Sequence, residues 1–210
     1  MIVLSHRGYW LKKQEKNKAV AFERSFELGF GTEVDIRDYK GKLVISHDIP
    51  DKSSMSVKFF FEIYNKHNNS LPLALNIKSD GLQVKLKKLL QHQNIKNYFV
   101  FDMSVPDGLE YIKQNIKSFT RESEYEKEPS LYNESCGVWL DEFKKHWISE
   151  DVIKKHILCK KNICIVSPDL HKRTYKKEWQ NYKEIEKKLK FNNIMICTEH
   201  PEKAEKFFNE

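Results

Sequence analysis

Short apolar segments alternate with amphipathic segments along the whole chain, and this alternation limits the possible folds more than any other feature. Residues 2–5 and 98–101 are examples of the apolar segments. The amphipathic segments carry apolar side chains at helical spacing, as in residues 57–66, where Phe60 and Ile63 share one face. Strands that are apolar throughout are typical of a parallel sheet with helices packed on it.

We count about eight such strands if residues 43–46 form a hairpin extension of the second unit, and that number favours a closed barrel. The predicted fold is therefore a compact α/β TIM barrel, (β/α)8, in a single domain over residues 1–210. No Gly-rich phosphate loop follows a strand, which argues against an open, nucleotide-binding sheet. The predicted strands are residues 2–5, 33–36, 73–78, 98–101, 119–122, 137–140, 163–166 and 194–197.

Helices are predicted between these strands from apolar spacing and from capping residues. A short helix is also expected at the end of the chain, after the last strand. A polar loop is expected after residues 119–122, where no helical pattern is present. The predicted helices are residues 17–29, 57–66, 82–90, 108–116, 149–158 and 179–189.

The chain is basic, with 37 Lys and Arg against 30 Asp and Glu and a net charge of +7. The lysines are scattered among glutamates, so we interpret most of this charge as a solvated surface. A positive field would still attract a phosphorylated or polyanionic substrate. No helix-turn-helix, zinc finger or aromatic–basic strand motif is present, and we expect no nucleic-acid partner.

No apolar run approaches the roughly 20 residues that span a bilayer, so no transmembrane segment is expected. Residues 1–4 are too short for the core of a secretion signal, and no secretory segment is visible. The four cysteines (Cys136, Cys159, Cys164, Cys197) lack metal-binding spacing. We interpret them as reduced core residues of a cytoplasmic protein. Nothing in the sequence predicts an oligomeric state.

Charged and polar residues follow the predicted strands at the points where they end. In a TIM barrel the carboxyl ends of the strands meet at one mouth, where active sites lie. A polar residue beside a strand is usually only a loop residue or a helix cap. The residues near such ends are His6, Arg7, Glu33, Asp35, His47, Asn76, Lys78, Asp102, Glu122, Asp141 and Glu199.

Glu33 and Asp35 are two apart in one strand and therefore point the same way. Two inward carboxylates repel each other and are costly to bury unless something compensates for their charge. A divalent cation with oxygen ligands would do so. Salt bridges to Arg7 and Lys78 are the alternative.

His6 and His47 each stand beside a charged residue at the end of an apolar strand. Because the pKa of an imidazole lies near neutrality, one of them could accept a proton while the other donates one across a phosphorus atom. The remaining histidines, including His171 and His200 near strand ends, are interpreted as structural.

The motifs His6-Arg7-Gly8, Glu33-Val34-Asp35 and His47-Asp48, with Ala21-Phe22, Gly29, Gly41 and Val44 between them, resemble the opening signature of the glycerophosphodiester phosphodiesterase family. The order and spacing match over roughly the first quarter of the chain. The rest matches more loosely. Leu75-Asn76-Ile77-Lys78 resembles the strand that supplies a further metal ligand and a lysine, and Thr198-Glu199-His200-Pro201 resembles the last strand.

The resemblance implies a TIM barrel that hydrolyses phosphodiesters with a divalent cation, Mg²⁺ or Ca²⁺. It assigns Glu33 and Asp35, with Asn76, to the metal, and Arg7 and Lys78 to the phosphate. It makes His6 and His47 the acid–base pair, with His6 favoured as the base. It allows a cyclic phosphate intermediate. The substrate would be a small-molecule or polymer-linked glycerol or sugar phosphodiester.

Two departures from the family pattern matter. Asn76 stands where the family has a third carboxylate, so metal affinity should fall unless Glu122, Asp102 or a substrate oxygen helps. The alternative is a non-catalytic barrel that binds phosphorylated ligands. Residues 49–57 are too short for the family's usual cap, which predicts an open mouth. Trp10 would supply an apolar or sugar-stacking wall there, or pack on the first helix.

Overall fold

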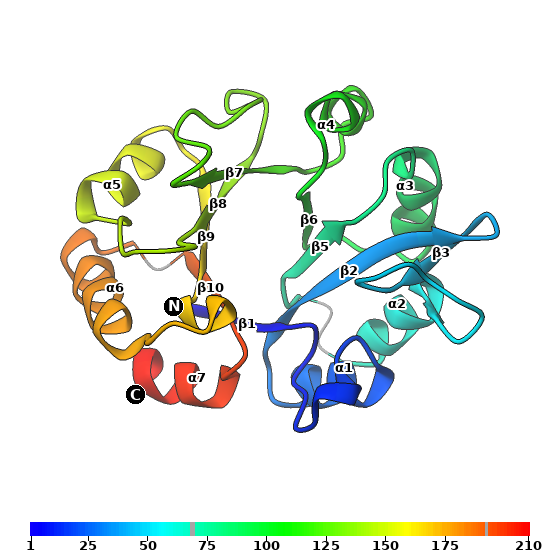
Figure 1. Cartoon of the computed structure of the whole chain (residues 1–210), viewed down its shortest axis with the longest axis horizontal. Helices are drawn as coiled ribbons and strands as arrows, with labels where there is room; N and C mark the ends of the chain where they lie inside the picture. Colours follow the sequence, from blue (N-terminus) through cyan, green and yellow to red (C-terminus); the bar gives the residue numbers. More distant parts are fainter. Residues whose placement is uncertain (68–69, 192) are drawn as a thin grey trace.

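Eight parallel strands form a closed barrel at the centre of the molecule (Figure 1). The computed structural model describes residues 1–67, 70–191 and 193–210. Within them each strand pairs with the next and the last with the first, which confirms the predicted TIM barrel. In pairing order the strands are β1 (Ile2–His6), β2 (Gly31–Tyr39), β5 (Leu73–Ile77), β6 (Tyr98–Phe101), β7 (Phe119–Ser123), β8 (Gly137–Asp141), β9 (Asn162–Val166) and β10 (Ile194–Thr198).

The barrel wall is weakest between β6 and β7. Val100 and Ser118 form an isolated bridge there, and the Val100 N–H donates to the carbonyl of Lys117 at 2.9 Å. By contrast, β2 and β5 keep parallel register over five residue pairs, from Thr32 to Ile36 on β2. The seam between β6 and β7 therefore parts above its single bridge.

A hairpin extends the second strand beyond the barrel. β3 (Lys42–Ile45) runs antiparallel to the end of β2, and β4 (Met55–Ser56) runs antiparallel to β3. Only residues 46–54 separate β3 from β4, and a helix begins directly afterwards. Both the expected hairpin and the expected short connection are present in the structure.

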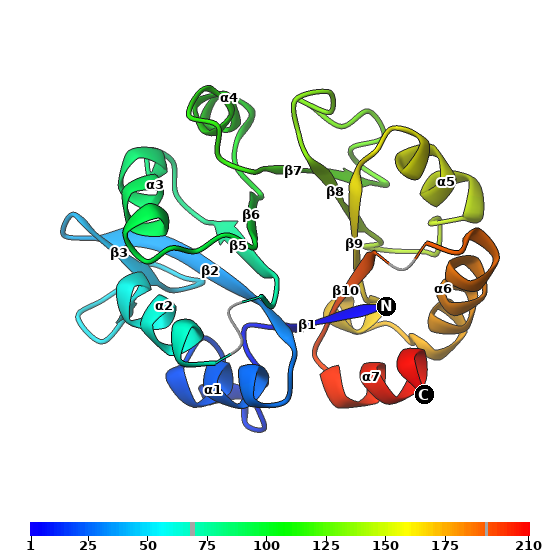
Figure 2. The ribbon, with the colours of Figure 1, turned by 180° about the vertical axis from the view of Figure 1, so that it is seen from behind.

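The helices form an outer ring around the barrel (Figures 1 and 2). The helix at residues 57–66 begins and ends where apolar spacing predicted. The prediction that another helix begins at residue 108 is wrong: it begins at Val105, because the Ser104 hydroxyl caps it and Pro106 fits its first turn. The helices are α1 (Ala19–Glu27), α2 (Val57–Lys66), α3 (Gln83–His92), α4 (Val105–Lys113), α5 (Glu150–Leu158), α6 (Lys176–Leu189) and α7 (Pro201–Asn209), with 3₁₀ turns at Lys13–Glu15 and Pro168–His171.

The outer ring has a gap after β7, where residues 124–136 form a loop as predicted. Inside the barrel, Phe99 stacks on Phe119 with ring centroids 3.7 Å apart, and Phe101 stacks on Trp139 at 4.0 Å. These rings fill part of the barrel interior. The polar groups gather at the carboxyl ends of the strands.

The cysteines are all free thiols, but they are not all core residues. Cys164 and Cys197 line the barrel interior, whereas Cys159 is exposed just after α5. The prediction of a core position is therefore wrong for Cys159. In the described part of the chain no helix is both long and apolar enough to cross a bilayer.

Candidate active site at the mouth of the barrel

The sequence places acidic, basic and amide side chains at the carboxyl ends of neighbouring strands. Parallel register sets His6 opposite Glu33 and Asp35 opposite Asn76. Glu199 follows the end of β10, on the other side of β1. These strands therefore bring five of the polar residues together at one side of the barrel mouth.

Glu33 is buried, with 1% of its surface exposed, and three groups contact its carboxylate. The Arg7 backbone N–H donates to Oε2 at 3.2 Å, and the Asn76 amide donates to Oε1 at 3.1 Å. His6 Nε2 lies 3.8 Å from Oε2. Burial, followed by the charge of Asp35, raises the pKa of Glu33, although His6, Arg7 and Asn76 oppose this.

Asp35 is fully buried and has more cationic partners than Glu33. Arg7 Nε lies 2.9 Å from Oδ2, and the Asn17 amide donates to the same oxygen at 2.8 Å. Lys78 Nζ lies 3.9 Å from Oδ1. The salt bridges to Arg7 and Lys78 that the sequence offered as an alternative to a metal are therefore both present.

His6 lies between two carboxylates. Its Nε2 faces Glu33, and its Nδ1 lies 3.5 Å from Glu199 Oε1, which also binds Lys16 Nζ at 2.6 Å. Burial acts to raise the pKa of Glu199, but hydrogen bonds from His6 and Lys16 outweigh it and lower the pKa to about 2. Glu199 is the nearer of the two carboxylates and has the lower pKa, so it favours the tautomer with the proton on Nδ1, which leaves Nε2 free to accept one.

The turn after β1 fixes these groups through its backbone. Arg7 has φ +61° and Gly8 has φ +79°, a left-handed region that favours glycine. A Cβ on Gly8 would lie 2.8 Å from the Cβ of Ala21 in α1. Glycine is thus required for close packing of this turn on α1, and the turn aims the Arg7 N–H at Glu33.

Lys78 begins a line of ion pairs that leads across the mouth. Its Nζ binds Asp102 Oδ2 at 2.8 Å, and Asp102 Oδ1 binds Arg121 Nη1 at 2.7 Å. Arg121 also pairs with Glu126. Burial acts to lower the pKa of Arg121, but Glu126 and Asp102 outweigh it and raise the pKa. Asp102 thus follows the end of β6 with both oxygens paired.

His47 lies in the hairpin after β3, apart from the buried carboxylates. Its side chain is 46% exposed, and Nδ1 is 2.9 Å from Asp48 Oδ1. It lines a shallow pocket that also includes Arg7, Lys16 and Asn17. The ion pair between Arg7 and Asp35 connects this pocket with the carboxylate pair. Arg7 therefore lies between Asp35 and the pocket that His47 lines.

The donor set can be tested for a divalent cation. Asp35 Oδ1 and Asn76 Oδ1 are buried oxygens that accept no hydrogen bond in the described part of the chain. Oxygens of carboxylates and amides are the ligands that Mg²⁺ and Ca²⁺ prefer. Across residues 1–67, 70–191 and 193–210 no three His, Cys, Asp or Glu side chains are grouped to hold a metal. A site here therefore depends on the amide of Asn76, and with it the residues fit a hard cation.

Two further candidate residues have different surroundings. The Trp10 indole N–H donates to the His6 carbonyl at 3.2 Å, and Lys16 lies over its ring at 4.3 Å. Trp10 thus borders the mouth. Glu122 does not: it pairs with His156 Nε2 of α5 at 3.1 Å. Phe119 faces the barrel interior, so strand alternation turns Glu122 outward, toward the helices.

Several residues at the mouth were not identified from the sequence as site residues. Asn17 and Lys16, in the turn before α1, contact Asp35 and Glu199. His171, interpreted as structural, has Nε2 2.6 Å from Asp141 Oδ1 on the far side of the mouth. The signal for Asn17 was weak, because a polar residue before a helix usually only begins it.

No protein-family model and no curated protein matches this sequence. Solved structures do resemble the chain. One is a glycerophosphodiester phosphodiesterase from Agrobacterium tumefaciens str. C58, with a TM-score of 0.71 and 12% identity over 100% of both chains. The chain has the fold of the glycerophosphodiester phosphodiesterases.

Two further structures agree. The Thermotoga maritima glycerophosphodiester phosphodiesterase has a TM-score of 0.61 and 19% identity, over 100% of this chain and 97% of that one. A phosphodiesterase from Oleispira antarctica, solved in complex with the product sn-glycerol-3-phosphate, has a TM-score of 0.68 and 13% identity over the same shares. The first quarter of the sequence resembles the glycerophosphodiester phosphodiesterase family in its motifs, and the whole chain resembles it in fold.

Proposed function

We propose that this protein is a metal-dependent phosphodiesterase that hydrolyses a glycerol- or sugar-linked phosphodiester. The observation that carries the proposal is the meeting of His6, Arg7, Glu33, Asp35 and Lys78 at the mouth of a barrel. Solved phosphodiesterases with the same fold support it. The product is an alcohol and a phosphomonoester.

We assign each of these side chains a role in the reaction. Glu199 holds the proton on Nδ1 of His6, so Nε2 serves as the base that takes a proton from the attacking hydroxyl. His47 serves as the acid that protonates the leaving alcohol. Arg7 and Lys78 neutralise the phosphoryl oxygens as charge builds on them.

A divalent cation, Mg²⁺ or Ca²⁺, held by Glu33, Asp35 and Asn76, would add positive charge beside the phosphoryl oxygens. Its binding would also relieve the repulsion between the two buried carboxylates, which contributes to the raised pKa of Glu33. Arg7 and Lys78 already pair with Asp35, so these cations stay near the site with or without a metal.

The attacking group is either water or a hydroxyl of the substrate next to the ester. In the second case a cyclic phosphate forms, and water then opens it. Phosphorus NMR of the product separates full hydrolysis from a lyase that stops at the cyclic ester. The short hairpin beside the mouth leaves the mouth open, which supports either a small-molecule or a polymer-linked substrate. The four free thiols support a cytoplasmic location.

A non-catalytic barrel that binds phosphorylated ligands is the second candidate. The observation that favours it is that Asn76 donates its amide N–H to Glu33 while Arg7 and Asn17 bind Asp35. Both carboxylates therefore have protein partners in the absence of a metal ion, which fits a site that has lost its metal.

The test is a panel of phosphodiesters incubated with Mg²⁺, Ca²⁺ or Mn²⁺, comparing wild type with His6→Ala and His47→Ala. Loss of general acid–base catalysis typically costs about 10²- to 10⁴-fold in rate. We expect losses of that size in both variants, with unchanged circular dichroism. Equal turnover in wild type and both variants would refute the proposed mechanism, and no turnover of any diester would favour the binding protein.

A further inference from the structure

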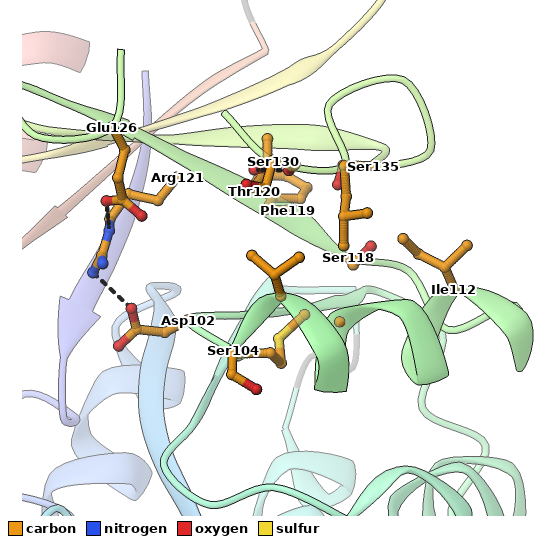
Figure 3. Close-up of a pocket in the computed structure, with 14 residues that line it drawn as sticks. Asp102, Ser104, Ile112, Ser118, Phe119, Thr120, Arg121, Glu126, Ser130 and Ser135 are labelled. Carbon is orange, nitrogen blue, oxygen red and sulfur yellow. Dashed lines mark hydrogen bonds and ion pairs between the residues drawn. The ribbon is translucent and has the colours of Figure 1, made fainter. Parts of the chain in front are cut away.

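A pocket opens through the barrel wall at the parted seam between β6 and β7. It lies between α4 on one side and β7 with the following loop on the other (Figure 3). Its volume is about 100 Å³. The pocket exists because β6 and β7 share a single bridge at Val100 and Ser118 and because no helix covers residues 124–136.

The pocket has one polar and one apolar wall. Ser118, Ser130 and Ser135 line the pocket, and among the described residues their hydroxyls have no hydrogen-bond partner. The opposite wall includes Val105 and Ile112 of α4. Free hydroxyls facing aliphatic side chains suit a ligand that has both hydroxyl groups and a carbon skeleton.

The pocket shares a wall with the candidate active site. Asp102 and Arg121 line it and pair with each other (Figure 3). Asp102 also binds Lys78, the residue assigned to the phosphate. Two consecutive ion pairs, of 2.8 Å and 2.7 Å, thus lead from Lys78 to the pocket. The edge of the pocket formed by Asp102 and Arg121 therefore adjoins the residue assigned to the phosphate.

We infer that this pocket, hereafter the seam pocket, binds the second alcohol of the phosphodiester and selects a small, uncharged, hydroxylated one. The inference rests on the proposed function. Free serine hydroxyls would donate to and accept from the hydroxyls of a polyol. An engineered apolar cavity of about 150 Å³ takes up benzene, so the smaller seam pocket suits a short-chain polyol better than a sugar ring.

The same residues argue against a cationic alcohol such as choline. Both oxygens of Asp102 are paired with Lys78 and Arg121, and Glu126 pairs with Arg121. The face of Phe119 is stacked on Phe99. A quaternary ammonium group requires free aromatic faces or unpaired carboxylates, and the seam pocket offers neither among its described residues.

The test compares glycerophosphoglycerol with glycerophosphocholine in wild type and in the double variant Ser118→Ala/Ser135→Ala. Wild type should prefer the polyol diester. Each lost hydrogen bond should cost about two- to tenfold in kcat/KM for that diester, while turnover of the choline diester stays unchanged. Ser79→Ala, whose hydroxyl binds Asp38 outside the pocket, is the matched control and should change neither.

Binding is measured separately, by amide chemical shifts of residues 118 and 135 during titration with glycerophosphoglycerol in chelator. Shifts in wild type that are lost in the double variant support the seam pocket even if no diester is turned over, a result that would refute only the proposed function. If wild type turns over both diesters with equal kcat/KM and the double variant changes neither value, the proposed role of the seam pocket is refuted. The proposed phosphodiesterase activity would still stand.

Discussion

The two buried carboxylates at the mouth, Glu33 and Asp35, have different partners. Asp35 is bound by Arg7 and Asn17, whereas Glu33 receives only neutral donors and a histidine at 3.8 Å. Among the residues that the structure describes, no Lys or Arg side chain pairs with Glu33. Its raised pKa reflects burial and the nearby charge of Asp35.

Outside the mouth, the pair of Glu122 with His156 should stabilise the fold in a pH-dependent way. Burial acts to raise the pKa of Glu122, but His156 and then Lys155 outweigh it, and the net shift is downward from 4.5. The stabilisation is thus present above about pH 4.5 and is lost as pH falls through the lower, folded-state pKa. We expect Glu122→Gln to lower the unfolding free energy by about 1–3 kcal/mol at pH 7.

Urea unfolding of wild type and Glu122→Gln at several pH values checks this. The two curves should converge as pH falls below the folded-state pKa of Glu122. A difference that does not shrink at any acidic pH at which both proteins are folded would contradict the assigned pair.

Sequence reasoning succeeded for the inward residues of β2 because Glu33 and Asp35 share the parity of one strand. The same rule, applied to β7, would have placed Arg121 at the mouth and Glu122 outside, since Phe119 belongs to the interior. The contacts of Lys16 and Asn17 could not be predicted, because they depend on how the turn after β1 folds back over β2.

At the scale of elements, α2 supports the hairpin that carries His47. The helix begins where the Ser56 hydroxyl accepts the Phe59 N–H at 3.1 Å, and it buries Phe60 and Phe61. Ser56→Ala should therefore cost about 1 kcal/mol of stability, and Ser56→Asp, which keeps a capping oxygen, should cost much less. Thermal unfolding of both variants measures this, and equal losses would rule out the cap.

The alternation of elements was predictable because each strand is apolar and each helix has its own periodicity. The ends of α2 and β6 were predicted to the residue, whereas the start of α4 was missed although Ser104 and Pro106 signal it. The open seam between β6 and β7 had no sequence signal, since strand pairing depends on the closure of the whole barrel. The seam pocket therefore could not be predicted from the sequence.

At the scale of the whole molecule, the net charge of +7 should speed capture of anionic diesters. Salt screens long-range attraction, so kcat/KM should fall by about threefold or more between roughly 0.02 M and 0.5 M NaCl. The value of kcat should change little, because the bound state is screened less. Initial-rate kinetics at fixed divalent cation measures both, and a kcat/KM independent of salt would show that the charge plays no part in capture.

The proposed mechanism requires Glu33, Asp35 and Asn76 to hold a divalent cation at the barrel mouth, beside His6. Calorimetric titration of Mg²⁺ and Ca²⁺ into wild type, Glu33→Gln and Glu122→Gln tests it most directly, since the two variants each neutralise one buried glutamate. We predict binding of one cation by wild type and by Glu122→Gln, and an affinity about tenfold or more weaker in Glu33→Gln. Absence of binding of either cation to wild type, or equal affinity in Glu33→Gln, would contradict the account.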